Sequence, residues 1–353
     1  MKYTRKELSG KALTALGPIF ADELGITICH EHCFHNAPKS FPEPREATAK
    51  RMANEPLSIK NVGYLRYGHL NRHDLELLDE NETLNELRPY RQAGGRTIVD
   101  ATNIDQGRDP LAIRRVALAT GLNIIMGSGY YVKSGQDLSL MDKRTEANIA
   151  EELVRDIFEG VGATGIHSGL IGEIGCSWPL EEAEKKVLRA AGMAQRETGA
   201  PLHVHPGRNE DAPFGIIEVL KEVNTDLTQT CIDHIDRTLL QPKNRHKLAG
   251  YGCFLEFDLW GLEGYYPEWL VAIDVPNDAQ RIAIIKDLIA HGYGKQILLA
   301  HDIDQRCRYM TYGGHGYTHI LNNGVPAMRR RTMTEEQIND LLIGNPKRFL
   351  TFR

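Results

Sequence analysis

Short apolar runs alternate with longer amphipathic stretches along most of this chain. Eight of the apolar runs have the length and boundaries of β-strands. They are Gly25–His32, Arg96–Thr102, Asn123–Gly129, Gly169–Cys176, Pro201–His205, Gln229–His234, Cys253–Asp258 and Gln296–Asp302. Eight strand–helix units in 353 residues predict an α/β fold, the (β/α)8 or TIM barrel.

Amphipathic segments between these runs predict the outer helices. Leu180–Thr198 and Asp278–His291 both carry apolar residues at helical spacing. We expect helix starts at Asp109-Pro110 and at Ser177-Trp178-Pro179, where a capping residue stands close to a proline.

The region His35–Tyr90 departs from the alternation. It holds several prolines and many charges, followed by an acidic helix-like stretch from Asp74 to Leu87. We predict a long insertion after the first strand, which leads into the first barrel helix. An insertion at that face of a barrel shapes a pocket or an oligomer contact. The sequence shows no repeat, low-complexity tract or linker, so we expect a single domain over residues 1–353.

Composition narrows the class of protein. The chain is 41% hydrophobic and 25% charged, as globular proteins are, and its net charge of -5 argues against nucleic acid as a partner. No apolar stretch has the length of a membrane span, and the polar start of the chain does not resemble a signal peptide. The six cysteines are scattered without a Cys-x-x-Cys pair. We therefore expect a cytoplasmic enzyme with reduced thiols.

Two histidines close the first predicted strand. His30 and His32 are separated by one residue, and alternate side chains of a strand share a face. In a barrel both imidazoles would point toward the axis near the C-terminal mouth, where enzymes of this architecture carry their chemistry. Imidazole is a common ligand for zinc-like ions, so the pair is half of a metal site.

Other metal-ligating residues fall at further strand ends. With the first pair they make four imidazoles and two carboxylates, an inventory that suits two divalent ions sharing a bridging carboxylate and a bridging hydroxide. The set is His30, His32, Glu173, His205, His234 and Asp302.

Taken singly, each of these positions has a structural alternative. A lone histidine at a strand end is more often a hydrogen-bonded core residue than a ligand, and Glu173 alone could be an ion-pair partner. His203 shares the face of His205 and competes with it for the ligand role, although we expect it in an inner layer. Asp233 and Asp236 flank His234 and are expected to support it or to form salt bridges.

Three longer strings carry a resemblance to a known family. They are Gly169–Leu180 (GLIGEIGCSWPL), His205–Arg208 with Ala212–Phe214, and Tyr312–Leu321 (YGGHGYTHIL). With them the chain resembles the phosphotriesterase-like branch of the amidohydrolase superfamily, in particular the phosphotriesterase-related proteins once described as resiniferatoxin-binding. The resemblance covers nearly the whole chain.

The resemblance implies a role for each ligand. His30 and His32 match the pair on the more buried ion, His205 and His234 match the ligands of the more exposed ion, and Asp302 matches an aspartate that binds the buried ion and moves protons. At the bridging position Glu173 stands where the best-known phosphotriesterases carry a carboxylated lysine. The implied cofactor is a pair of divalent metal ions, zinc first, with Mn, Co or Ni also compatible.

A metal-dependent hydrolase follows, in which a bridging hydroxide attacks the substrate and Asp302 takes a proton as the catalytic residue. Tyr131, Arg208 and His301 are the expected substrate-binding residues, each with packing or a structural ion pair as the alternative. A basic and aromatic loop after the last strand suits a small anionic substrate. It holds Arg306, Arg308, Tyr312, His315 and His319.

Substrate and assembly stay open at this point. The resemblance favours a small amide such as an N-acetyl amino acid or N-acetyltaurine. A lactone or a phosphoric ester is the alternative among hydrolases, and a non-catalytic ligand-binding protein is the alternative of another class. Relatives are often dimers, so a homodimer is a further expectation, with the insertion as its candidate contact.

Overall fold

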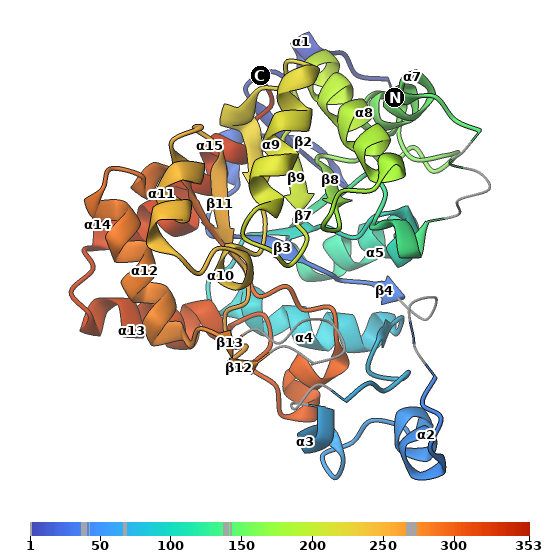
Figure 1. The fold of residues 1–353 in the computed structure, drawn as a ribbon, viewed down its shortest axis with the longest axis vertical. Helices are drawn as coiled ribbons and strands as arrows, with labels where there is room; N and C mark the ends of the chain where they lie inside the picture. The colour runs from blue at the N-terminus through green and yellow to red at the C-terminus, as the bar shows by residue number, and fades with distance from the viewer. Residues whose placement is uncertain are drawn as a thin grey trace.

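The computed structural model describes residues 2–36, 41, 43–65, 69–136, 141, 143–265 and 274–353. Its centre is a set of eight parallel strands, drawn in Figure 1 inside a ring of helices. The strands are β3 (Thr27–Glu31), β6 (Thr97–Asp100), β7 (Asn123–Met126), β8 (Ile171–Gly175), β9 (Leu202–His205), β10 (Thr230–Ile232), β11 (Phe254–Phe257) and β14 (Ile297–Leu299). Each lies within one of the eight predicted runs.

Hydrogen bonds join these strands into a closed barrel. One run of the sheet has the order β3-β6-β7, and the other has the order β14-β11-β10-β9-β8. The amide of Gly172 donates to Ser128 O over 2.7 Å and links the end of β7 to β8. The amide of Asp302 donates to His30 O over 3.1 Å and links the end of β14 to β3. The predicted barrel architecture is confirmed.

Helices follow the strands and cover the outside of the barrel. They are α5 (Pro110–Thr120), α7 (Glu146–Phe158), α8 (Glu182–Thr198), α9 (Ala212–Glu222), α10 (Ile235–Thr238), α11 (Pro242–Ala249), α12 (Asp278–Ala290), α13 (Val325–Arg330), α14 (Glu335–Asn339) and α15 (Asn345–Leu350). Asp109 caps α5 as predicted, since its side chain accepts from Ala112 N. The predicted start at Ser177 is wrong. The N-cap of α8 is Glu181, and Ser177 donates instead to the Glu184 carboxylate.

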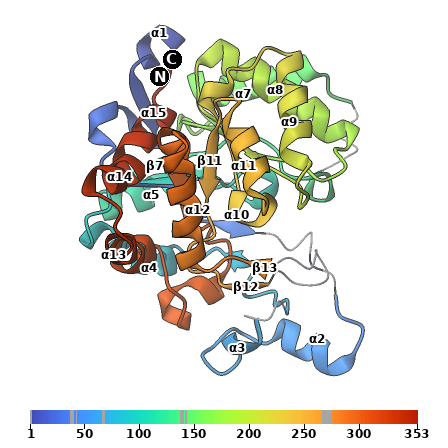
Figure 2. The same ribbon diagram turned by 60° about the vertical axis from the view of Figure 1, so that its left-hand side comes forward.

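The insertion after β3 extends beyond the barrel at the end away from the chain termini (Figures 1 and 2). It contains β4 (His35–Asn36), α2 (Ala47–Asn54), α3 (Val62–Leu65), β5 (Glu76–Leu77) and the beginning of α4 (Glu80–Gln92). The helix predicted from Asp74 thus starts later, because Asp79 caps it by accepting from Asn81 N and Glu82 N. Short pairs of strands lie outside the barrel at β1 (Lys11–Thr14) with β2 (Gly17–Phe20) and at β12 (Gly264–Tyr265) with β13 (Asp274–Val275), and α1 (Arg5–Leu8) precedes them.

The barrel interior is layered. The end of the interior opposite to the C-terminal ends of the strands is apolar. There Cys29, Val99, Cys231 and Leu298 from the strands pack against Phe349 of α15. Apolar side chains on the other face of the strands join the large core beneath the helices. The polar side chains at the C-terminal ends of the strands therefore pack against a close-packed apolar layer, which restricts their movement. None of the helices in the described ranges has both the length and the hydropathy for crossing a bilayer.

Candidate metal centre

The predicted ligands converge at the C-terminal ends of β3, β8, β9, β10 and β14. Five of these six side chains are buried, and the side chain of Asp302 is 14% exposed. The order of strands in the barrel brings them together from positions up to 272 residues apart in a chain of 353. The six residues are His30, His32, Glu173, His205, His234 and Asp302.

One half of the group is formed by the first and last barrel strands. His32 Nε2 lies 3.2 Å from Asp302 Oδ1, and His30 Nε2 lies 3.8 Å from the same oxygen. The three side chains offer one ligand atom each within 4.8 Å of one another. His30 and His32 share the inner side as predicted, yet Cys29 is in the inner apolar cluster too. A register shift between Ile28 and Glu31 breaks the regular alternation there.

The other half surrounds Glu173. Its Oε2 lies 2.9 Å from His205 Nδ1 and 3.6 Å from His234 Nε2. The same oxygen is 3.6 Å from His30 Nε2, so the carboxylate stands between the two halves. The bridging role that the sequence resemblance implies for Glu173 stays a prediction.

The inward ring nitrogens differ in their partners, since His234 Nε2 lies 2.9 Å from His205 Nδ1. His30 Nε2 is buried and has no hydrogen-bond partner within the described residues. On the outward side, His32 Nδ1 lies 2.9 Å from Thr102 Oγ1 and His234 Nδ1 lies 2.9 Å from Asp258 Oδ1. An orphaned buried nitrogen beside convergent imidazoles and carboxylates fits a site for divalent metal ions.

Electrostatics in the group fit ligands that bind as neutral imidazole. Burial lowers the pKa of His205 to about 4 and lowers the pKa of His234 well below its usual range. Burial acts in the same direction on His30, but the surrounding carboxylates, Glu256 first, raise its pKa overall. Burial raises the pKa of Asp302 to about 7. A carboxyl that changes protonation near neutral pH suits a proton acceptor.

Several supporting residues were not anticipated from the sequence. Gln106 donates from Nε2 to Glu173 Oε1 over 2.7 Å, and Asn103 donates to Glu173 O over 2.9 Å. Asp258 accepts from both the amide and the ring of His234. Such partners fix the orientation of ligands. A carboxylate at the end of β11 is visible in the sequence, but loop residues such as Gln106 carry no recognisable pattern.

Backbone geometry also constrains the ligands. Gly172, which precedes Glu173, has φ +121°, and a Cβ there would lie 2.4 Å from His203 O. Only glycine fits at that position. Asp302 adopts φ +53°, and Arg308 donates from Nη1 to its carbonyl over 2.6 Å. Arg308 is buried and thus holds the strand end that carries Asp302.

The competing residues lie below the ligand layer. His203 Nδ1 is 2.9 Å from Asp233 Oδ1 and 3.3 Å from Glu256 Oε2, and all three side chains are buried. This is the inner layer expected for His203, although these residues also form a ligand-sized group with His30. Asp236 accepts from Arg281 Nε over 2.7 Å, as expected of a salt-bridge residue.

The three expected substrate-binding residues differ in their surroundings. The Tyr131 ring stands 5.0 Å from the His205 ring in an edge-to-face contact. Burial raises the pKa of Tyr131 well above its usual range and lowers the pKa of His205 to about 4, and the charge of Arg208 acts on both groups in the lowering direction. His301, in contrast, is fully buried, with Nδ1 2.7 Å from Glu31 Oε1 and Nε2 accepting from Ile320 N. Both of its ring nitrogens are thus engaged inside the protein, which favours a positioning role.

Basic residues of the loop after β14 are mostly paired within the protein. Arg306 Nε lies 3.2 Å from Glu82 Oε2, and His319 Nε2 lies 2.6 Å from Asp278 Oδ2. Tyr312 donates to Glu82. The loop is therefore anchored to α4 and α12, and it offers less free positive charge than its sequence suggests. Arg237 is a basic residue that the sequence did not single out, and its Nη2 lies 3.3 Å from His205 Nε2.

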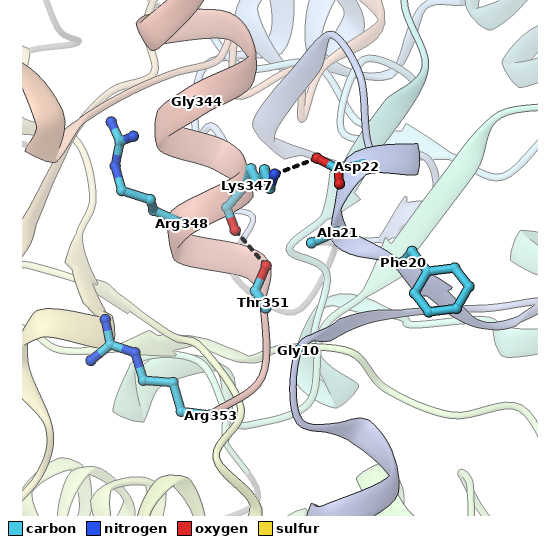
Figure 3. Close-up of a pocket in the computed structure, with 9 residues that line it drawn as sticks. All are labelled: Gly10, Phe20, Ala21, Asp22, Gly344, Lys347, Arg348, Thr351 and Arg353. Carbon is cyan, nitrogen blue, oxygen red and sulfur yellow. Dashed lines mark hydrogen bonds and ion pairs between the residues drawn. The ribbon is translucent and has the colours of Figure 1, made fainter.

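A separate cavity of about 750 Å³ opens beside the chain termini (Figure 3). Lys347 pairs there with Asp22, and Thr351 donates to Lys347 O over 2.6 Å. Arg353 is bound to Asp226 over 2.7 Å. The lining, which includes no histidine, cysteine or glutamate, offers none of the chemistry found at the strand ends.

Comparison with known proteins yields one consistent group. The model of the phosphotriesterase family matches residues 10–350. An N-acetyltaurine hydrolase from Xenopus tropicalis is 40% identical over 348 residues, covering 98% of this chain and 99% of the relative. A resiniferatoxin-binding protein from Rhodobacter sphaeroides matches with TM-score 0.93 at 34% identity, covering 98% and 97% of the two chains. A lactonase from Listeria monocytogenes matches with TM-score 0.79 at 25% identity, covering 97% and 99%.

Proposed function

The chain belongs to the phosphotriesterase family and is a metal-dependent hydrolase of small molecules, and from this premise we propose that it cleaves the amide bond of N-acetyltaurine or a related N-acetyl amino acid. The name of the relatives at 40% identity supports the choice of an amide. The convergence of four imidazoles and two carboxylates at the strand ends is the observation that carries the proposal.

We assign two divalent ions, zinc first, to these six side chains. His30, His32 and Asp302 would hold one ion, His205 and His234 would hold the other, and Glu173 would be shared between them. When bound, the ions supply Lewis acidity that activates water and polarises the scissile carbonyl. Zinc suits a ligand set of imidazoles and carboxylates, and Mn, Co or Ni would accept the same atoms.

The protein's own groups handle the proton and the substrate. Asp302 accepts the proton of the attacking water and passes it to the leaving amine, since its Oδ1 lies within the ligand group, 3.2 Å from His32 Nε2. Arg208 pairs with the sulfonate or carboxylate of the substrate, because its charge stands beside Tyr131 and His205. Tyr131 forms the wall against which the acyl portion packs.

A substrate panel tests the proposal. Purified protein loaded with zinc is assayed on N-acetyltaurine, N-acetyl amino acids, lactones and phosphate esters. We expect kcat/KM for one of the N-acetyl compounds to exceed the values for the other classes by orders of magnitude. Faster turnover of a lactone would overturn the amide assignment and favour the second candidate, which the structural match to a lactonase supports.

The metal assignment is tested separately by elemental analysis. We expect two tightly held ions per chain at the strand ends of the wild-type protein. We expect Glu173→Ala to hold fewer than two ions there, because the carboxylate shared by both is lost. Unchanged metal content in that variant would contradict the bridging role. The identity of the metal is tested in two ways. We expect zinc to co-purify with the protein, and we expect zinc to give the highest kcat/KM when the metal-free protein is reconstituted with each metal in turn.

Three broader features complete the proposal. We propose that residues 1–353 form one domain, because the family model spans residues 10–350 without a break. A cytoplasmic location is supported by the six cysteines, all of which are described and free of disulfide bonds. A homodimer through the insertion at 35–90 is the proposed assembly, and the measured mass in solution decides it.

A further inference from the structure

A second group of metal-ligating side chains lies on the outside of the barrel, away from the six residues at the strand ends. His246 is in the last turn of α11, Asp287 is near the end of α12, and His291 is the C-cap of α12. One ligand atom from each of them lies within 4.8 Å of the others. None of these residues takes part in the proposed catalysis.

The two helices bring the group together by lying side by side (Figure 2). Asp287 and His291 are four residues apart, which places them on one face of α12. His246 faces them from α11. The chain continues from α11 into β11 and from α12 into β14. The group therefore lies near the N-terminal ends of the strands, whereas the six predicted ligands lie at their C-terminal ends.

Contacts within the group are short and centred on Asp287. His246 Nε2 lies 2.7 Å from Asp287 Oδ2. His291 Nδ1 lies 3.4 Å from Asp287 Oδ1 and 2.8 Å from Asp287 O, so Nε2 is the ring nitrogen of His291 that is left for an ion. The two imidazole rings stand 4.2 Å apart between their centres. Their side chains are 27% and 53% exposed, so an ion can reach them from solvent without opening the fold.

We propose that His246, Asp287 and His291 bind a divalent transition-metal ion, distinct from the ions of the catalytic centre. Two imidazole nitrogens and one carboxylate oxygen form a ligand set that selects zinc, nickel, cobalt or copper over magnesium and calcium. Water completes the coordination at this exposed position.

The group also offers a negative charge to a cation. Asp287 Oδ2 lies 2.7 Å from His246 Nε2, beside two imidazole rings whose centres are 4.2 Å apart. A dication would be held by the two neutral imidazoles and this carboxylate. The bound ion clamps the end of α11 to the end of α12, and it raises the metal content of the chain by one.

The experiment counts ions in the full-length protein. Wild type, His246→Lys and His291→Ala are stripped of metal, dialysed against zinc and analysed for zinc per chain, with N-acetyltaurine hydrolysis measured in parallel. We expect both variants to bind one ion fewer than wild type, and we expect their hydrolysis to equal that of wild type. If N-acetyltaurine is not hydrolysed, the amide assignment fails, but the number of zinc ions per chain still tests the proposed site.

His246→Lys separates a metal site from an ion pair, because lysine places a positive charge facing Asp287 but has no imidazole. A matched control, Arg329→Ala, breaks an exposed ion pair with Glu335 and should leave the zinc count unchanged. Added zinc should raise the melting temperature of wild type above that of His246→Lys. Equal zinc counts and equal zinc-dependent melting in wild type and both variants would overturn the proposal.

Discussion

Glu173 lies between the two groups of side chains at the strand ends. Its carboxylate lies 2.9 Å from His205 Nδ1 and 3.6 Å from His30 Nε2. The side chain is 2% exposed, so solvent does not replace a lost ligand atom easily. A glutamate also supplies both oxygens directly, whereas a lysine at this position must first be carboxylated. The site is thus able to assemble from the protein and metal alone.

Gln106 offers a sharper test of this carboxylate than replacement of Glu173 itself. We expect Gln106→Leu to weaken metal binding by about 10–100-fold, since the donor to Glu173 Oε1 is lost while the side-chain volume is kept. Competition with a metallochromic chelator measures the affinity. Gln229→Leu is the control, because it removes a buried amide that bonds Thr351 O near the other end of the barrel. Equal affinities in wild type and Gln106→Leu would contradict the positioning role.

The convergence of the six side chains was predictable from the sequence, because each of them lies at or beside the end of an apolar run. A histidine or carboxylate that ends an apolar run is placed at the barrel mouth by the strand itself. His301 shows the limit of this reasoning. It also ends such a run, but Glu31 and the amide of Ile320 engage both of its ring nitrogens. Those contacts depend on tertiary packing, which no local pattern encodes.

At the scale of elements, the strands and barrel helices were predictable and the connections were not. The period of apolar residues found α12 to within one residue, Asp278–Ala290 against the predicted Asp278–His291. The start of α8 was missed because Glu184 bonds both Ser177 and the amide of Glu181, which moves the cap. The register shift in β3 was equally hidden. The conformations of loops and bulges depend on contacts between residues that are distant in sequence, and the apolar periodicity carries no information about those contacts.

The loop after β14 is joined to α12 through Asp278, which bonds His319, Arg281 and the Gly261 amide. Burial alone raises the pKa of this carboxyl, but these partners, His319 first, lower it to about 2 from an ordinary 3.8. A lowered folded-state pKa means that the ionised form stabilises the fold. That stability is present above about pH 4 and is lost as the pH falls through about 2.

We therefore expect Asp278→Asn to lower the free energy of unfolding by about 2 kcal/mol at pH 7. The difference from wild type should shrink as the pH falls below about 4, where the wild-type carboxyl begins to take up its proton. Urea unfolding at several pH values measures it. Glu335→Gln, which breaks an exposed ion pair, should leave stability unchanged at every pH. A pH-independent loss in Asp278→Asn would show that the ionised carboxylate is not the source.

At the scale of the whole molecule, the proposed ions tie together strands that are far apart in the chain. Their ligands come from β8, β9 and β10 and from the ends of β3 and β14, where the barrel closes. Without cations this end concentrates buried acids, and burial raises the pKa of Glu31 to about 7 and of Asp302 to about 7. Glu173 differs, because the neighbouring histidines, His205 first, outweigh burial and lower its pKa well below the usual range. Its negative charge then lacks the cations that the proposed site would supply.

Removal of the metal should consequently destabilise the entire barrel rather than one loop. We expect chelation to lower the melting temperature by several degrees, and we expect restored zinc to raise it, because binding to the folded state alone contributes about 4 kcal/mol when free zinc is 1,000 times its dissociation constant. The zinc-dependent change in melting temperature is measured by calorimetry on His246→Lys. Because that variant lacks a ligand of the proposed site between α11 and α12, the change reports on the strand-end centre alone. The melting temperature should rise with the logarithm of free zinc. The contrary result is a metal-free protein, verified by elemental analysis, with the same melting temperature as the zinc-loaded form. It would mean that the six side chains hold the barrel closed without ions.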